Sequence, residues 1–152
     1  MNTLARMCPV EDILLDAKVQ NRHQLFEYVA RHLQRRYGLA AEPIIGSLEA
    51  RERMGSTALG QGVAIPHARL SDLSAPLAVF VRPEQPIAFD APDGKPVGEL
   101  ILLLVPQHAS QDHLQILADA ARLFCERSFR ALLRAAATPF DVRRILLESQ
   151  TS

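Results

Sequence analysis

Hydrophobic residues repeat at three- and four-residue spacing between residues 21 and 37, and this periodicity predicts an amphipathic helix. Its apolar positions are Leu25, Phe26, Val29, Ala30, Leu33 and Tyr37. Asn21 is suited to cap the first turn, and Gly38 is suited to end the last one. A second helix is predicted to begin at Pro43. Its apolar side is formed by Ile44, Ile45, Leu48 and Met54.

Three shorter apolar runs have the length of buried strands. They cover residues 63–65, 77–83 and 99–106, and the last of them has the composition of a central strand. Residues 86–97 alternate around an Asp93-Gly94 turn and predict a hairpin or a loop with extended arms. Residues 9–20 fit a helical turn in one half and a short strand in the other, so the sequence leaves both open.

The last third of the chain predicts three helices. Ser110 is suited to cap the first of them. The apolar face of that helix is formed by Leu114, Leu117, Ala118, Ala121 and Phe124. Two shorter helices are predicted over residues 129–137 and 139–147, the second capped by Thr138. Strands that alternate with helices predict an α/β fold in which helices cover one sheet, and we expect a single domain spanning residues 1–152.

Composition excludes several classes of protein. Apolar residues make up 48% of the 152-residue chain, and 17 basic residues balance 17 acidic ones, so no overall field attracts nucleic acid or an acidic membrane. Cys8 and Cys125 lie far apart, which favours a reduced intracellular chain over a disulfide. The N-terminus is unlike a signal peptide, and no apolar run reaches the ~18 residues of a membrane span. We therefore expect a cytoplasmic protein.

Common catalytic and cofactor motifs are missing from the sequence. It contains no HExxH, CxxC or HxH, so no metal site is predicted. Walker A and GxGxxG sequences are also missing, as is the GxSxG of α/β-hydrolases. We therefore predict no cofactor, and the remaining chemistry rests on histidine and arginine.

His67 is the leading candidate for chemistry. It follows Pro66 at the end of a predicted strand, beside a loop that contains Gly55, Ser56 and Thr57. Backbone N–H groups in glycine-rich loops form concavities that bind anions. An alternative is a structural histidine bonded to a backbone carbonyl, and the adjoining loop makes that alternative the weaker one.

Other histidines and two arginines are secondary candidates. His113 falls in the first turn of the helix capped by Ser110, where the helix dipole favours phosphate, although an exposed surface histidine fits equally well. His108 has the same ambiguity in a weaker position. Arg51 and Arg53 adjoin the glycine loop, and only one of them can point along it toward His67. The two remaining histidines, His23 and His32, are interpreted as solvated.

Three segments resemble one known family. They are LEARERMGSTALGQGVAIPHAR, PIAFDAPDGKPVGELILLLVP and DHLQILADAARLF. They are similar to the IIA proteins of the fructose/mannitol class of the bacterial phosphotransferase system, in its nitrogen-regulatory branch. The similarity runs from about Asp16 to the last helix. Family members often have glycine where this chain has Ala68, which affects the expected backbone path more than the chemistry.

The resemblance implies a fold, a reaction and a set of partners. The fold is a mixed β-sheet flanked by helices on both faces. His67 would accept a phosphoryl group as a tele-phosphohistidine from an HPr-like carrier (NPr), with His113 and Arg51 beside the phosphate. We expect Gly55, Ser56 and Thr57 to supply phosphate-binding groups. The regulated partners would be proteins such as potassium transporters or sensor kinases.

Docking of a carrier requires an apolar patch ringed by polar residues around His67. Candidates are Met54, Leu59, Ile65, Leu70 and Phe89, each of which could instead belong to the core. Two alternatives to a regulatory phosphocarrier stay open. One is a stand-alone sugar IIA component that passes phosphate to a IIB protein. The other is a binding module of the same fold that is not phosphorylated.

Overall fold

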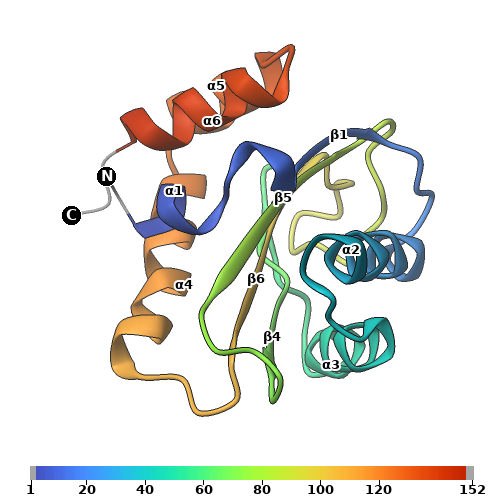
Figure 1. Cartoon of the computed structure of the whole chain (residues 1–152). Coiled ribbons are helices and arrows are strands. Elements are labelled where there is room, and N and C mark those ends of the chain that lie inside the picture. Colours follow the sequence, from blue (N-terminus) through green and yellow to red (C-terminus); the bar gives the residue numbers. More distant parts are fainter. Residues whose placement is uncertain (1–2, 150–152) are drawn as a thin grey trace.

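The computed structural model describes residues 3–149, in which a mixed sheet lies between two groups of helices (Figure 1). The sheet has the strand order β1-β5-β6-β3-β2, and β4 also pairs with β6. Its strands are β1 (Ile13–Ala17), β2 (Ala58–Gly60), β3 (Val63–Ala64), β4 (His67–Leu70), β5 (Leu77–Pro83) and β6 (Glu99–Pro106). The predicted α/β fold with a mixed sheet is confirmed.

The central strand is β6, and three other strands pair with it. It runs antiparallel to β5 and parallel to β3 and β4. Residues 99–104 are buried because both faces of the sheet are covered, which explains the continuous apolar run of the sequence. In the pairing with β4, His67 lies opposite Leu103. The candidate histidine is therefore fixed against the middle of the most buried strand.

The helices are α1 (Thr3–Met7), α2 (Arg22–Tyr37), α3 (Ala41–Arg53), α4 (Gln111–Phe124), α5 (Arg127–Ala135) and α6 (Pro139–Glu148). On one side of the sheet α2 and α3 bury one hydrophobic cluster, and on the other α1, α4, α5 and α6 bury a second (Figure 1). No helix within residues 3–149 combines the length and apolar character needed to cross a membrane.

Helix ends follow the capping signals of the sequence. The side chain of Asn21 accepts from the N–H of Gln24, and Gly38 adopts a left-handed φ of 71°. Ser110 and Thr138 cap α4 and α6, each through a reciprocal pair of hydrogen bonds with the third helical residue. These predicted caps are confirmed.

Several boundaries differ from the prediction. Residues 9–20 contain a short 3-10 helix, η1 (Val10–Asp12), followed by β1, so both open alternatives occur in turn. Helix α3 begins two residues before Pro43, which is possible because N–H groups in the first turn have no intrahelical partner. Helix α5 also begins two residues earlier than predicted. The short helix α1 was not predicted.

Candidate functional site

His67 begins β4 rather than following the end of a preceding strand. Ile65 and Pro66 separate it from β3, and the carbonyl of Pro66 accepts from the N–H of Leu103 at 2.9 Å. Ile65 and Pro66 are buried, whereas the imidazole is half-buried and reaches a surface groove. Ala68 pairs with Leu104 in the strand, so this position has no need of glycine.

The hydrogen-bond partners of His67 define its tautomer. Its Nδ1 lies 3.0 Å from the carbonyl oxygen of Ile65, and its Nε2 lies 3.1 Å from Nε of Arg51. A carbonyl can only accept and a guanidinium can only donate, so Nδ1 carries the hydrogen and Nε2 carries the lone pair. The nitrogen that faces Arg51 is therefore the nucleophilic one.

The surroundings of His67 favour the neutral imidazole. Burial lowers the pKa of His67 below its ordinary value of 6.5, and the positive charge of Arg51 lowers it further. The hydrogen bond with Ile65 and the negative charge of Glu52 raise the pKa without cancelling that decrease. A neutral ring with a free electron pair is the form of histidine that can attack phosphorus.

Arg51 holds a fixed position in the last turn of α3. Its Nε donates to His67, and its Nη1 donates to the carbonyl of Gly55 at 2.8 Å. Arg53 lies two residues further and is exposed. The expectation that only one of these two arginines points toward His67 is confirmed, and that arginine is Arg51.

The groups of the glycine loop are bonded within the chain. The N–H of Gly55 donates to the carbonyl of Glu52, and the hydroxyl of Ser56 donates to the carbonyl of Phe89 at 2.5 Å. The N–H and hydroxyl of Thr57 both donate to the Glu52 carboxylate. Phosphate binding by Gly55, Ser56 and Thr57 stays a prediction, and in this structure the loop supports Arg51.

His113 is the third residue of α4, immediately after the loop that leaves β6. Its Nδ1 accepts from the N–H of Ser110 at 3.4 Å, and its own N–H donates to the Ser110 hydroxyl at 3.3 Å. Because Nδ1 is the acceptor, the neutral ring carries its hydrogen on Nε2. At Nε2, His113 is therefore a hydrogen-bond donor, whereas His67 is a hydrogen-bond acceptor. His108 is exposed in the preceding loop.

A groove of about 620 Å³ brings the three predicted site residues together. Arg51, His67 and His113 all line it, although they come from α3, β4 and α4. Apolar lining is supplied by Met54, Leu103, Val105, Leu114 and Leu117, and further polar lining by Arg69 and Gln107. A polar reactive centre surrounded by apolar side chains suits a macromolecular partner.

The predicted docking patch is only partly at the surface. Met54 is 82% exposed and Leu59 is 41% exposed. Ile65, Leu70 and Phe89 are buried, so these three residues belong to the core. Leu114, which the sequence assigned to the apolar face of its helix, is 40% exposed and lines the groove.

The prediction that His32 is solvated is wrong, whereas His23 is exposed as predicted. The imidazole of His32 is buried, and its Nε2 lies 2.7 Å from Oδ1 of Asp12. Its position, three residues after Val29 and seven after Leu25, follows the buried side of α2 and could have indicated this burial. The sequence around its partner, Asp12, contains no comparable pattern that would indicate burial.

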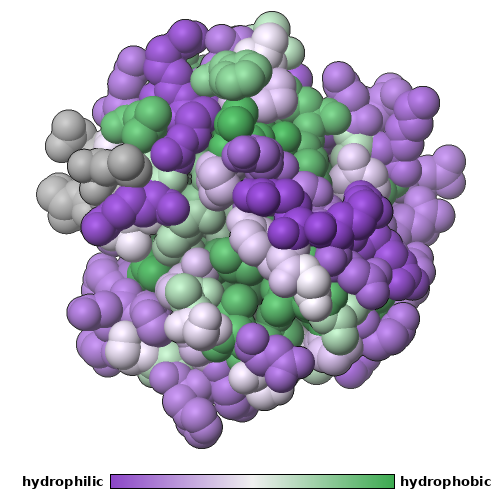
Figure 2. Space-filling view, viewed as in Figure 1, coloured by the Kyte–Doolittle hydropathy of each residue, from purple (hydrophilic) through white to green (hydrophobic). Residues whose placement is uncertain are grey.

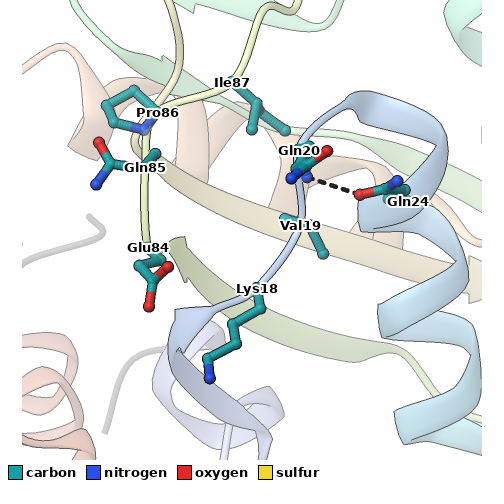
Figure 3. Close-up of a pocket in the computed structure, with 8 residues that line it drawn as sticks. All are labelled: Lys18, Val19, Gln20, Gln24, Glu84, Gln85, Pro86 and Ile87. Atoms are coloured by element: carbon teal, nitrogen blue, oxygen red, sulfur yellow. Dashed lines mark hydrogen bonds between the residues drawn. The ribbon is translucent and has the colours of Figure 1, made fainter.

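A second groove, of about 550 Å³, shares no lining residue with the first (Figure 3). It lies where the chain leaves β1 and β5, and it is lined by Lys18, Val19, Gln20, Gln24 and residues 84–87. Inside it, the N–H of Gln20 donates to the side chain of Gln24 at 2.8 Å (Figure 3). Its lining contains no histidine.

A protein-family model matches nearly the whole described chain. The family described as "Phosphoenolpyruvate-dependent sugar phosphotransferase system, EIIA 2" matches residues 6–149. The chain therefore belongs to the EIIA type-2 family of the phosphotransferase system.

Relatives within the family carry two kinds of name. The chain is 39% identical to a nitrogen regulatory protein of Pseudomonas aeruginosa over 84% of this chain and 80% of that one. It is 36% identical to a fructose-specific EIIA component of Haloferax volcanii over 68% of each chain. The crystal structure of nitrogen regulatory protein IIA-Ntr from Neisseria meningitidis superposes with a TM-score of 0.89 at 39% identity, over 95% of this chain and 99% of that one.

Proposed function

We propose that the protein is a phosphocarrier of a nitrogen-regulatory phosphotransferase system, and that His67 accepts the phosphoryl group through Nε2. The observation that carries this proposal is the bonding of the imidazole, with Nδ1 on the carbonyl of Ile65 and Nε2 directed at Arg51. This arrangement supplies a neutral nucleophile with a cation beside it. Membership of the EIIA family supports the same reaction class.

The proposed step exchanges one phosphorus–nitrogen bond for another. The lone pair of His67 Nε2 forms the new bond to phosphorus, while the bond to the carrier's phosphohistidine breaks and leaves its electron pair on the carrier's nitrogen. Nδ1–H stays bonded to Ile65, whose carbonyl stabilises the positive charge that develops on the ring. The Nε–H of Arg51 stops donating to Nε2 and instead donates a hydrogen bond to a phosphoryl oxygen. His113 donates a second hydrogen bond to the phosphoryl group through its Nε2–H.

The donor in this proposal is an HPr-like carrier of the NPr type, which docks on the apolar rim of the groove. The phosphorylation state then controls target proteins, such as potassium transporters or sensor kinases, in the cytoplasm. The longer match to nitrogen regulatory proteins, 84% of this chain against 68% for the fructose-specific relative, favours this role.

A second candidate is a sugar IIA component that passes the phosphoryl group to a IIB protein. The 36% identity to a fructose-specific component is the observation in its favour. The chemistry at His67 is the same in both candidates, and they differ only in the acceptor that follows.

The test is phosphorylation with purified components. The protein is incubated with phosphoenolpyruvate, enzyme I and an HPr-type carrier, and its intact mass is measured before and after acid treatment. We expect one acid-labile phosphoryl group on the wild type and none on His67→Ala, with His108→Ala as a labelled control. An unlabelled wild type, or equal labelling of His67→Ala, would refute the proposal. Adding a sugar-specific IIB protein to the labelled protein then separates the two candidates.

A further inference from the structure

Glu52 is a buried carboxylate between two arginines of the sequence. It is 5% exposed, and both of its oxygens accept hydrogen bonds from Thr57. Oε2 lies 3.2 Å from the Thr57 nitrogen, and Oε1 accepts from the Thr57 hydroxyl. Within residues 3–149 this carboxylate has no ion-pair partner closer than 4.0 Å. A buried carboxylate stabilised only by the donors of one loop residue holds that residue firmly.

Thr57 connects this carboxylate to the segment that carries His67. The carbonyl of Thr57 accepts from the N–H of Ile65 at 3.1 Å, which continues the pairing of β2 with β3. The carbonyl of Ile65 then accepts from Nδ1 of His67 at 3.0 Å. Glu52, Thr57, Ile65 and His67 therefore form one chain of hydrogen bonds, and each link donates toward Glu52.

Pro66 leaves the Ile65 carbonyl little freedom to turn. A residue before proline is confined to extended backbone, and the ring of proline fixes its own φ. The carbonyl of Pro66 is bonded to the N–H of Leu103 in β6. A further constraint on Ile65 is the bond from its N–H to Thr57, so the position of Thr57 contributes to where the acceptor for His67 lies.

We propose that Glu52 is a positioning residue for His67, and that it acts through Thr57 and Ile65 to hold the hydrogen on Nδ1 and the lone pair on Nε2. Each hydrogen bond in the series fixes the position of the group that makes the next one, so the Glu52 carboxylate at one end holds in place the carbonyl that accepts from His67 at the other. The effect on transfer rests on the proposed function of His67, but the tautomer itself is a property of the unphosphorylated protein.

Arg51 favours the same tautomer from the other side of the ring, so the test has to separate the two influences. An Arg51→Ala background removes the donor at Nε2 and leaves only the chain from Glu52. In this background we compare Glu52→Gln, which removes the charge, with Thr57→Val, which removes the hydroxyl. Thr57→Ser keeps the hydroxyl and serves as the matched control. Glu42→Gln removes an exposed carboxylate from the same helix.

The readout is the ¹⁵N NMR spectrum of His67 at a pH where the ring is neutral, because protonated and unprotonated ring nitrogens have distinct shifts. We expect the hydrogen on Nδ1 in the wild type, in Arg51→Ala, and in the Thr57→Ser and Glu42→Gln controls. Adding Glu52→Gln or Thr57→Val to Arg51→Ala should shift the ring toward a mixture with Nε2–H. In the otherwise wild-type protein, Glu52→Gln should slow phosphorylation roughly tenfold, by analogy with the smaller losses found when the hydrogen-bond partner of a metal-binding histidine is removed.

Retention of the wild-type tautomer in both double variants, with folding verified by amide spectra, would overturn the proposal. A role limited to folding the loop predicts that result, together with a lower thermal midpoint. If Glu52→Gln does not fold, Thr57→Val gives the answer because it preserves the side chain's outline. A wild type that takes up no phosphoryl group, while the tautomer still changes in the variants, would refute the proposed function and support the positioning role.

Discussion

The Nε–H of Arg51 donates a hydrogen bond to Nε2 of His67, with 3.1 Å between the two nitrogens. The unprotonated nitrogen of the ring is therefore already in contact with the arginine in the unphosphorylated protein. The same guanidinium reaches the Gly55 carbonyl through Nη1. Two donors from one planar group fix the arginine relative to both the ring and the loop. In the proposed transfer, bonding of phosphorus to Nε2 would free the Nε–H of Arg51 to donate to a phosphoryl oxygen.

Replacing Arg51 by lysine should therefore slow transfer even though the charge is kept. An ammonium group cannot reproduce the pair of donors held in one plane. A charge-assisted hydrogen bond contributes about 1.5–3 kcal/mol, which corresponds to a rate loss of roughly 10- to 100-fold. The measurement is the initial rate of acid-labile labelling at saturating carrier. Arg53→Lys is the matched control on the same helix, and equal rates for Arg51→Lys and wild type would contradict the role of the guanidinium.

The pKa of His67 should move in opposite directions when its two charged neighbours are neutralised. Burial is the main cause of its lowered pKa, Arg51 adds to the decrease, and Glu52 opposes it. Arg51→Gln should raise the pKa of His67, and Glu52→Gln should lower it, both measured by NMR titration of the ring. Because only the neutral ring accepts a phosphoryl group, labelling of the wild type should persist below about pH 6.5. It should be lost as the pH falls through the folded pKa, and Arg51→Gln should move that loss to higher pH.

His113 depends on Ser110 for its orientation. The reciprocal bonds between them direct Nε2–H of His113 away from the cap. Ser110→Ala should lower the free energy of unfolding by about 1 kcal/mol. It should also slow labelling, because the backbone N–H of His113 loses its hydroxyl acceptor and the first turn of α4, which carries the ring, is held less firmly. Thr138→Ala removes the equivalent cap of α6, where no site residue is involved. A similar loss of stability in both variants, with slower labelling only in Ser110→Ala, is the expected pattern.

Carrier docking should depend on the exposed apolar side chains of the groove. Met54 is 82% exposed and Leu114 is 40% exposed, so truncating either one should leave the free energy of unfolding nearly unchanged. Burying such a side chain on docking contributes about 1.5–3 kcal/mol. Met54→Ala and Leu114→Ala should therefore require roughly tenfold or more carrier for half-maximal rate.

Hydrophobic surface also occurs away from the groove, over α5 and α6 (Figure 2), and it provides the control for docking. Phe140 is 71% exposed at the start of α6. Phe140→Ala should leave the concentration dependence on carrier unchanged. A shift as large as that of Met54→Ala would place the docking surface elsewhere.

Local patterns predicted the parts of the fold that depend on local physics. The caps at Asn21 and Ser110 follow from side chains that bond within three residues, and β6 follows from its apolar run. Nonlocal burial could not be predicted in this way. Ile65 and Phe89 fitted surface or core equally well, because an apolar side chain in an extended segment can face either a partner or a helix layer.

Buried charges were the larger omission. Glu52 lies within a charged run that is typical of a solvated helix end, and its burial depends on the bond to Thr57 across the following loop. His32 pairs with Asp12, a residue twenty positions earlier in the sequence. Neither pairing has a local signature. The sequence therefore pointed to His67 and, through the family resemblance, to Arg51, but it did not indicate the two buried carboxylates.

Asp12 should be a major source of stability outside the site. Its side chain is 1% exposed and accepts from His32 at 2.7 Å, from Arg36 at 3.1 Å and from the hydroxyl of Tyr37. Burial alone would raise the pKa of Asp12, but the bonds from His32, Tyr37 and Arg36 outweigh it and lower the pKa below its ordinary 3.8. Burial, together with the hydrogen bond from its hydroxyl to Asp12, raises the pKa of Tyr37 to about 12.

Asp12→Asn should therefore lower the free energy of unfolding by about 2–3 kcal/mol, measured by urea titration at pH 7. A carboxylate with a lowered folded pKa stabilises the protein above about pH 3.9, and this contribution is lost as the pH falls through the folded value. The difference between wild type and Asp12→Asn should shrink in that acidic range. Asp72→Asn replaces an exposed aspartate and should follow the wild type at every pH. A difference between wild type and Asp12→Asn that stays constant below pH 3.9 would mean that the Asp12 charge does not stabilise the fold.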